Sequence, residues 1–206
     1  MNACTHDVER NNLTLILGGT RSGKSAYAEK RVLAYEKEAQ ESGKDQCGVL
    51  YVATAEVYPD DASMLDRIKR HQQRRPPHWE TQECPLRLAA CLSKRLHERA
   101  TSLPAVIMVD CVTLWISNIL FSLPEPEDTH AFEAAIRAEL TALTDLVAQF
   151  PCKWVLVSGE TGLGLVAPDA IGRVYCDGLG LANQQLAASA HEVMLVVAGR
   201  ALLLPA

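Results

Sequence analysis

The chain has 206 residues, enough for one domain with a full hydrophobic core, and 48% of them are hydrophobic. Its formal net charge of −5 argues against a general nucleic-acid binder, which is usually basic. No apolar run reaches the length of a membrane span, and the polar first dozen residues lack the apolar segment of a secretory signal. We therefore expect a cytoplasmic protein without membrane insertion or a nucleic-acid partner, with an N-terminal extension at 1–12 and a single domain at 13–206.

Apolar runs alternate with helical patterns along this domain. Strands are predicted at 13–19, 48–55, 105–111 and 152–160, followed by a closing pair at 192–199 and 201–205. Helices are predicted at 25–43, 61–75, 85–100 and 114–123, within 125–150 after a polar turn, and over most of 178–190. Apolar strands separated by helices predict an α/β fold, in which a mostly parallel sheet carries helices on both faces.

The cysteines do not form a recognisable ligand or disulfide pattern. There are seven, widely spaced and without a C-x-x-C pair, at positions 4, 47, 84, 91, 111, 152 and 176. An odd number at wide spacing argues against a disulfide framework and against a zinc site. We expect most of them to be reduced thiols in or near the core.

The segment GGTRSGKS, residues 18–25, satisfies the pattern G-x-x-x-x-G-K-[ST]. A predicted strand precedes it and a predicted helix follows it, as a phosphate-binding P-loop requires. Glycines allow backbone N–H groups to turn toward phosphate oxygens, and the helix N-terminus adds a favourable dipole. Lys24 would neutralise phosphate charge, and the Ser25 hydroxyl can hold Mg²⁺. The alternative is a glycine-rich turn that binds no nucleotide.

Two predicted strands end in a carboxylate. Asp110 ends the strand at 105–111, where a P-loop protein needs an acidic residue to organise Mg²⁺. Glu160 ends the next strand, where it could serve as a base, contact Mg²⁺ or cap the turn. Asp110 is not followed by the D-x-x-G of a regulatory GTPase, and the chain contains no N-K-x-D. These absences argue against a GTPase switch, although a P-loop alone does not choose a function.

The predicted helix 61–75 concentrates positive charge around a histidine. On a helix, Met64, Ile68 and His71 share one face. Four arginines lie within about one turn of His71: Arg67, Arg70, Arg74 and Arg75. Guanidinium groups pair bidentately with phosphate oxygens, and neighbouring cations favour the neutral, nucleophilic imidazole. The alternatives are a packed histidine at the edge of an apolar face and a solvated basic helix.

Taken in order, several segments resemble the bifunctional adenosylcobinamide kinase/adenosylcobinamide-phosphate guanylyltransferase family of cobalamin biosynthesis. The resemblance runs from about Leu13 to about Leu204. The matching segments are LILGGTRSGKSAYAE, LYVATAE, RIKRHQQRRPPHWETQE, VDCVTLWISNILF, VLVSGETGLGLVAPD and GLANQQLAASAHEVMLVVAGRALLLP. Their combination is far more specific than the P-loop alone, and it implies a RecA-like P-loop NTPase fold. His191 stands where the family pattern has an acidic residue, and we give it no role.

The resemblance implies two reactions. In the first, ATP or GTP phosphorylates the aminopropanol hydroxyl of adenosylcobinamide, with Lys24 as a catalytic residue. In the second, His71 takes GMP from GTP as a phosphoramidate and passes it to adenosylcobinamide phosphate, giving adenosylcobinamide-GDP. The implied metal is Mg²⁺, held by Ser25 and Asp110. The implied assembly is a homotrimer.

The resemblance also implies a set of nucleotide-binding residues that extends beyond the P-loop. They are Gly18, Gly19, Thr20, Arg21, Ser22, Gly23, Lys24, Ser25, Ala53, Thr54, Ala55, Gln72, Gln73, Arg74, Arg75, Glu83 and Asp110.

Two other functions remain open from the residues themselves. One is a P-loop kinase for a different small molecule, in which the basic helix closes over the substrate and no covalent nucleotide adduct forms. The other is a nucleotide-sensing module or ATPase without transfer chemistry. Three tryptophans, Trp79, Trp115 and Trp154, could stack on a large flat ligand, although core packing is expected for at least two of them.

Overall fold

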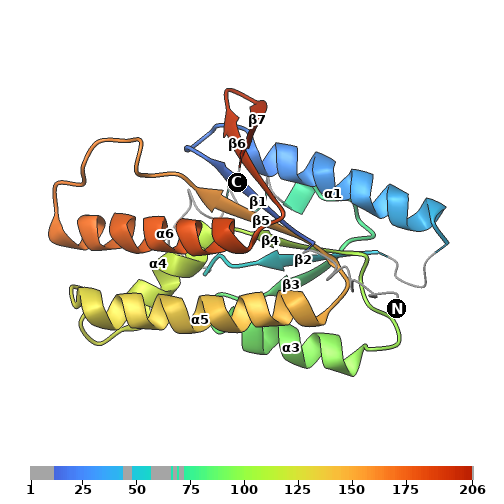
Figure 1. Cartoon of the computed structure of the whole chain (residues 1–206), viewed down its shortest axis with the longest axis horizontal. Coiled ribbons are helices and arrows are strands. Elements are labelled where there is room, and N and C mark those ends of the chain that lie inside the picture. The colour runs from blue at the N-terminus through green and yellow to red at the C-terminus, as the bar shows by residue number, and fades with distance from the viewer. Residues whose placement is uncertain (1–11, 44–47, 57–65, 67–68, 70–71, 206) are drawn as a thin grey trace, which may run out of the picture.

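The computed structural model describes residues 12–43, 48–56, 66, 69 and 72–205, which contain one seven-stranded sheet (Figure 1). The strand order is β3-β2-β4-β5-β1-β6-β7. Neighbouring strands are parallel except for β6 and β7, which form an antiparallel hairpin. The strands are β1 (Leu13–Gly18), β2 (Val49–Ala53), β3 (Glu80–Glu83), β4 (Val106–Asp110), β5 (Lys153–Gly159), β6 (Glu192–Val197) and β7 (Arg200–Leu204).

The helices cover the two faces of the sheet unequally, as Figure 1 shows. One face carries α1 (Lys24–Glu41). The opposite face carries four helices, which are α3 (Leu88–Glu98), α4 (Val112–Ser122), α5 (Thr129–Gln149) and α6 (Ala170–Ser189). The predicted α/β architecture with helices on both faces is therefore confirmed, with most of the helical mass on one side.

Each face of the sheet has its own core. On the four-helix side, side chains of β1 and β5 such as Leu15 and Trp154 pack with Trp115 of α4 and Phe132 of α5. On the α1 side, the core is smaller and includes Tyr51 of β2. Strands β1 and β5 are buried on both faces, which explains why they read as continuous apolar runs rather than alternating ones.

The observed elements differ from the predicted ones in two places. β3 was not predicted, because its sequence ETQE is polar and mostly exposed, and it lies at the edge of the sheet. α6 begins at Ala170 rather than near Gly178, since the Asp169 side chain accepts a hydrogen bond from the Gly172 N–H at 2.6 Å and caps the helix.

Several predictions fall on residues that the structure does not describe, including most of the N-terminal extension and much of the helix at 61–75. Asp66, Lys69 and residues 72–74 are helical, which agrees with a helix there. His71 and its predicted neighbours Arg67 and Arg70 lie outside the described residues. No helix in the described part of the chain combines the length and the apolar character that a membrane span needs.

All three tryptophans belong to the core. Trp115 and Trp154 are fully buried and Trp79 is 6% exposed, so none of them presents a flat face to a ligand. The expected core packing is confirmed.

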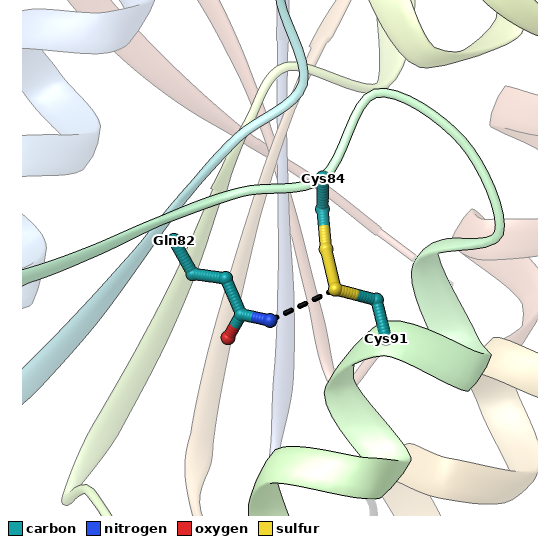
Figure 2. The surroundings of a disulfide bond; sticks show 3 residues. All are labelled: Gln82, Cys84 and Cys91. Atoms are coloured by element: carbon teal, nitrogen blue, oxygen red, sulfur yellow. Dashed lines mark hydrogen bonds between the residues drawn. A yellow bond between two sulfur atoms is a disulfide. The ribbon is translucent and has the colours of Figure 1, made fainter.

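The cysteine prediction is wrong for one pair. Cys84 and Cys91 form a disulfide, whereas Cys111, Cys152 and Cys176 are free. Figure 2 shows why sequence spacing did not reveal the pair: Cys84 lies just after β3, and the chain then turns back so that Cys91 faces it from the first turns of α3. The Gln82 amide donates to the Cys91 sulfur at 2.8 Å.

Candidate functional site

A cavity of about 610 Å³ lies at the carboxyl ends of the parallel strands. Residues from the end of β2, the end of β3 and the end of β4 line it, together with the loop that follows β1. The carboxyl ends of parallel strands meet at one edge of a sheet, which is where open α/β folds bind their ligands. The cavity therefore has the position expected of an active site in this fold.

The P-loop forms one side of this cavity, and residues 20–25 line it. Gly18 must be glycine, because a Cβ there would lie 2.6 Å from the Val196 carbonyl oxygen and 2.5 Å from the Ser22 Oγ. Gly23 has a φ of 94°, a left-handed conformation that glycine adopts without strain. The loop is braced from the far end of the chain, since the Gly199 N–H donates to the Ser22 carbonyl at 2.7 Å.

Lys24 and Ser25 begin α1, so the N-terminus of that helix faces the cavity. The Lys24 Nζ donates to the Gly19 carbonyl at 3.2 Å, which places the ammonium group over the loop. Unpaired N–H groups and the helix dipole make such an N-terminus favourable for a phosphate group. This side of the cavity has the chemistry that favours a phosphate group.

Asp110, at the end of β4, is held by a tyrosine. The Tyr51 hydroxyl donates to the Asp110 Oδ2 at 2.8 Å. Burial and the nearby carboxylate raise the pKa of Tyr51 well above its usual range, so the phenol stays protonated and remains a donor. We call the P-loop together with Ala53 and Asp110 the strand-end wall.

Thr54 supports this wall from behind. It is fully buried, and its hydroxyl donates to the Cys111 carbonyl at 2.7 Å and accepts from the Cys111 N–H at 2.8 Å. Burial, followed by the charge of Asp110, raises the pKa of the Cys111 thiol to about 11, so that it stays neutral near pH 7. Cys111 is thus poorly suited to act as a nucleophile.

A second wall of the cavity is formed by Gln72, Arg74 and Arg75 of the basic segment, by which we mean residues 72–79. Side chains attach it to other elements. Arg74 pairs with Glu29 of α1 at 2.8 Å, and the Arg75 guanidinium lies 3.5 Å from the centroid of the Tyr51 ring. Further along, Glu36 of α1 accepts from the Trp79 Nε1 at 3.2 Å and contacts His78 Nε2 at 3.1 Å.

The structure brings most of the predicted site residues to this one cavity. The predicted residues that line it are Thr20, Arg21, Ser22, Gly23, Lys24, Ser25, Ala53, Ala55, Gln72, Arg74, Arg75, Glu83 and Asp110. Four others, Gly18, Gly19, Thr54 and Gln73, do not line it, and their direct contact with nucleotide stays a prediction. His71 lies outside the described residues, but its neighbour Gln72 lines the cavity.

Glu160 takes one of the three roles that the sequence left open. Its Oε1 accepts from the Gly162 N–H at 2.6 Å, and its own N–H donates to the Gly18 carbonyl at 3.1 Å. The carboxylate thus caps the turn after β5, and the backbone of Glu160 joins that turn to the P-loop.

One known protein family matches nearly the whole chain. The family model described as "Cobinamide kinase / cobinamide phosphate guanyltransferase" matches residues 14–204. The chain belongs to this family. Membership accounts for the P-loop NTPase-like fold and for the gathering of the family's motifs around one cavity.

Relatives of the family match at high coverage. The chain is 36% identical over 192 residues to "Bifunctional adenosylcobalamin biosynthesis protein CobU" of Escherichia coli. The matched residues make up 91% of this chain and 96% of that protein. It is 38% identical over 185 residues to "Bifunctional adenosylcobalamin biosynthesis protein CobP" of Pseudomonas aeruginosa, covering 90% and 92%. The CobU protein of Salmonella typhimurium is also 36% identical, over 192 residues.

Sequence reasoning missed several residues that line the cavity. Tyr51 was read as part of an apolar strand, and Thr81 lies in the strand that was not predicted. Thr113 also lines the cavity, and its hydroxyl accepts from the Gly159 N–H at 2.5 Å. The signal for Tyr51 was its place two residues before Ala53, which puts both on the same side of β2.

Proposed function

We propose that this protein carries out both reactions of its family, phosphorylating adenosylcobinamide with ATP or GTP and then transferring GMP to the product. The observation that supports this proposal is the single cavity that joins a P-loop to the basic segment. The P-loop suits the phosphates of a nucleoside triphosphate, and the segment with Arg74 and Arg75 directly follows His71 in the sequence. A kinase alone would not require a histidine immediately before this segment in the sequence.

In the kinase step, the substrate hydroxyl oxygen attacks the γ-phosphorus and the nucleoside diphosphate leaves with the electrons of the broken bond. The hydroxyl proton is released as the new P–O bond forms. Lys24 would stabilise the charge on the transferring group, and the N-terminus of α1 would hold the remaining phosphates.

In the guanylyl step, a ring nitrogen of His71 attacks the α-phosphorus of GTP, and pyrophosphate leaves. A phosphate oxygen of adenosylcobinamide phosphate then attacks the same phosphorus, the P–N bond breaks and the histidine is regenerated. The covalent intermediate divides one difficult displacement into two easier ones. Arg74 and Arg75 would pair with phosphate oxygens in both halves.

The residues of the cavity fit Mg²⁺. Ser25 and Asp110 both line it, and hydroxyl and carboxylate oxygens suit this ion. The described residues contain no group of three or more histidine, cysteine, aspartate or glutamate side chains that could bind a metal ion on its own. Mg²⁺ commonly binds through one or two protein oxygens plus substrate phosphates, so we propose Ser25 and Asp110 as its protein ligands. When bound, the ion would neutralise phosphate charge.

Exposed apolar side chains support the proposal that the protein is an oligomer, as the family resemblance implies. Val197, Leu202 and Leu203 of the β6–β7 hairpin are each 58–61% exposed, and such patches often mark subunit contacts. Light scattering coupled to size-exclusion chromatography will measure the mass. A mass of three chains supports the homotrimer, whereas the mass of one chain excludes it.

We also propose a cytoplasmic location, where ATP and GTP are available.

The decisive experiment is covalent labelling. The wild-type protein is incubated with Mg²⁺ and GTP labelled at the α-phosphate, denatured in alkali, and compared with His71→Ala and with the control His191→Ala. His191 is exposed, lies just before β6 and is not among the residues that line the cavity. We expect alkali-stable, acid-labile label on the wild type and on His191→Ala but not on His71→Ala.

Mass spectrometry of the labelled protein will separate His71 from His78. Absence of label on the wild type would remove the guanylyl-histidine and leave a P-loop kinase for another small molecule. The kinase reaction is tested independently, by following transfer from γ-labelled ATP or GTP to adenosylcobinamide.

A further inference from the structure

Tyr51 occupies an unusual position between the two walls of the cavity. It is only 2% exposed and belongs to the core on the α1 side of the sheet, yet it lines the cavity. In the sheet it pairs with Thr81 of β3 and Met108 of β4. Asp110 is two residues beyond Met108 and therefore lies on the same face of β4. A side chain as long as tyrosine can reach such a diagonal neighbour.

The two ends of the Tyr51 side chain make different contacts. Its hydroxyl donates to the Asp110 Oδ2 at 2.8 Å, which fixes the orientation of that carboxylate. Its ring lies beneath the Arg75 guanidinium, 3.5 Å from the centroid, a distance at which an arginine is attracted to an aromatic face. One residue thus touches both the strand-end wall and the basic segment.

The contacts of Arg75 leave it able to bind a ligand. Its Nη1 donates to the Thr81 Oγ1 at 3.4 Å, and its buried Nε has no acceptor among the described residues. A guanidinium has five N–H donors, so most of them remain available to phosphate oxygens at the cavity. The Tyr51 ring and the Thr81 hydroxyl hold this group in place from one side.

A purely structural role does not explain the hydroxyl of Tyr51. Phenylalanine would fill the same core volume and would also support a cation on its ring. The hydroxyl group adds one contact, the hydrogen bond to Asp110. Since Asp110 is the carboxylate proposed to hold Mg²⁺, the hydroxyl acts on the phosphate chemistry of the cavity.

We propose that Tyr51 is a positioning residue, which orients Asp110 through its hydroxyl and Arg75 through its ring so that both act on one nucleotide. The inference rests on the proposed function, since it takes the nucleotide and Mg²⁺ as the ligands of this cavity. Tyr51 does not react. It fixes the distance between a carboxylate on the strand-end wall and a guanidinium on the basic segment.

The test separates the hydroxyl from the ring. Binding of a GTP analogue with a methylene bridge between its α- and β-phosphates, which cannot transfer GMP, is measured by calorimetry with and without Mg²⁺. For Tyr51→Phe we expect Mg²⁺ to strengthen binding about 10-fold less than in the wild type, because a hydrogen bond to a charged group is lost. Binding without Mg²⁺ should be unchanged, because the ring still supports Arg75.

Tyr51→Leu removes the ring as well, and we expect its binding without Mg²⁺ to be about 3-fold weaker than that of the wild type. In an Arg75→Ala background, the Phe and Leu variants should bind equally without Mg²⁺. In an Asp110→Asn background, Tyr51→Phe should have no effect on the Mg²⁺ response, because the carboxylate it orients is gone. A merely structural role would instead give additive effects.

Tyr35→Phe is the matched control. Tyr35 lies on α1, and its hydroxyl forms a hydrogen bond of 3.3 Å with Thr14, outside the cavity. Thermal unfolding is recorded for every variant, and if Tyr51→Leu does not fold, the Phe variant and its Asp110→Asn cycle decide alone. The proposal is overturned if Tyr51→Phe weakens binding equally with and without Mg²⁺, or if its effect persists beside Asp110→Asn.

The outcome can be told apart from failure of the proposed function. If the wild type shows histidine labelling but Tyr51→Phe has the same Mg²⁺ response as the wild type, guanylyl transfer stands and the positioning role of Tyr51 is excluded. If Tyr51→Phe loses the Mg²⁺ response but the wild type shows no histidine labelling, the positioning role of Tyr51 stands and guanylyl transfer is excluded.

Discussion

The strand-end wall and the basic segment differ in what holds them in place. The strand-end wall is fixed by backbone: β1, β2 and β4 belong to one hydrogen-bonded sheet, and the P-loop is tied to Gly199 and Glu160 by main-chain hydrogen bonds. The basic segment is fixed by side chains, chiefly through pairing of Arg74 with Glu29, stacking of Arg75 on Tyr51, and contacts of His78 and Trp79 with Glu36.

This difference suits two reactions in one cavity. Backbone contacts in a sheet cannot change without disrupting the core, so the strand-end wall keeps one geometry for phosphates. A side chain that reaches solvent, like that of Arg74 at 44% exposed, can exchange ionic partners, because a phosphate oxygen offers a guanidinium the same contact as a carboxylate oxygen. Arg74 can therefore leave Glu29 for a phosphate oxygen, while the Tyr51 ring keeps Arg75 in place. The following predictions test this distinction.

The largest expected effect is on the chemistry of the strand-end wall. Lys24→Ala should lower the rate of phosphoryl transfer from γ-labelled ATP to adenosylcobinamide by about 100- to 1,000-fold, because a preorganised cation is removed from the developing charge. The fold should be unchanged by circular dichroism. Lys30→Ala, an exposed residue on the same helix, is the control and should retain the rate. An active Lys24→Ala enzyme would move the kinase site elsewhere.

The next effect concerns the backbone of the same wall. Gly18→Ala should lower the free energy of unfolding by about 2 kcal/mol, because the new Cβ would overlap the Val196 carbonyl, which cannot move independently of β6. Denaturant titration measures this free energy. Gly19→Ala is the control and should keep the stability of the wild type, since a Cβ there meets nothing within 4 Å. Equal losses in the two variants would contradict the packing argument.

The disulfide fixes the turn between β3 and α3 covalently, next to Glu83 of the cavity. Reducing Cys84–Cys91, or replacing Cys84 with serine, should lower the free energy of unfolding by about 2 kcal/mol, because a short loop is no longer closed in the unfolded chain. Denaturant titration with and without a thiol reductant measures the change. Cys176→Ser should keep the full response to reductant, whereas a wild type indifferent to it would show that the bond is absent in solution.

The smallest effect on stability is expected in the basic segment. Glu36→Gln should cost about 1 kcal/mol, because the buried carboxylate loses its pairing with His78 and accepts more weakly from Trp79. Histidine labelling should slow a few-fold while the kinase rate stays constant, since the P-loop does not depend on this contact. The exposed Glu38→Gln on the same helix is the control. A kinase rate that fell with the labelling rate would show that the two walls are not independent.

The sequence was a good guide to the strand-end wall. Its strands β1, β2 and β4 are apolar and almost wholly buried, and the P-loop pattern fixes where the first strand ends. For this reason Lys24, Ser25 and Asp110 were all predicted, and the structure places them at one cavity.

The sequence was a poorer guide wherever side chains meet across the fold. The polar sequence of β3 gave no strand signal, so Thr81 was missed, and Tyr51 read as one more apolar residue. The pairing of Cys84 with Cys91 depends on a turn that cannot be predicted from the spacing of the cysteines. Glu29 and Glu36 look like surface charges of a helix, and only the packing of the basic segment against α1 shows that both are buried.

The position of β1 in the sheet has a consequence for how the protein is made. β1 is the first strand of the domain, but its neighbours are β5 and β6, and its loop is braced by Gly199 near the C-terminus. The ribosome synthesises the P-loop well before β5, β6 and Gly199, which hold it in place. The P-loop therefore cannot reach its final conformation before Gly199 has been synthesised, and a chain truncated before the β6–β7 hairpin lacks this brace.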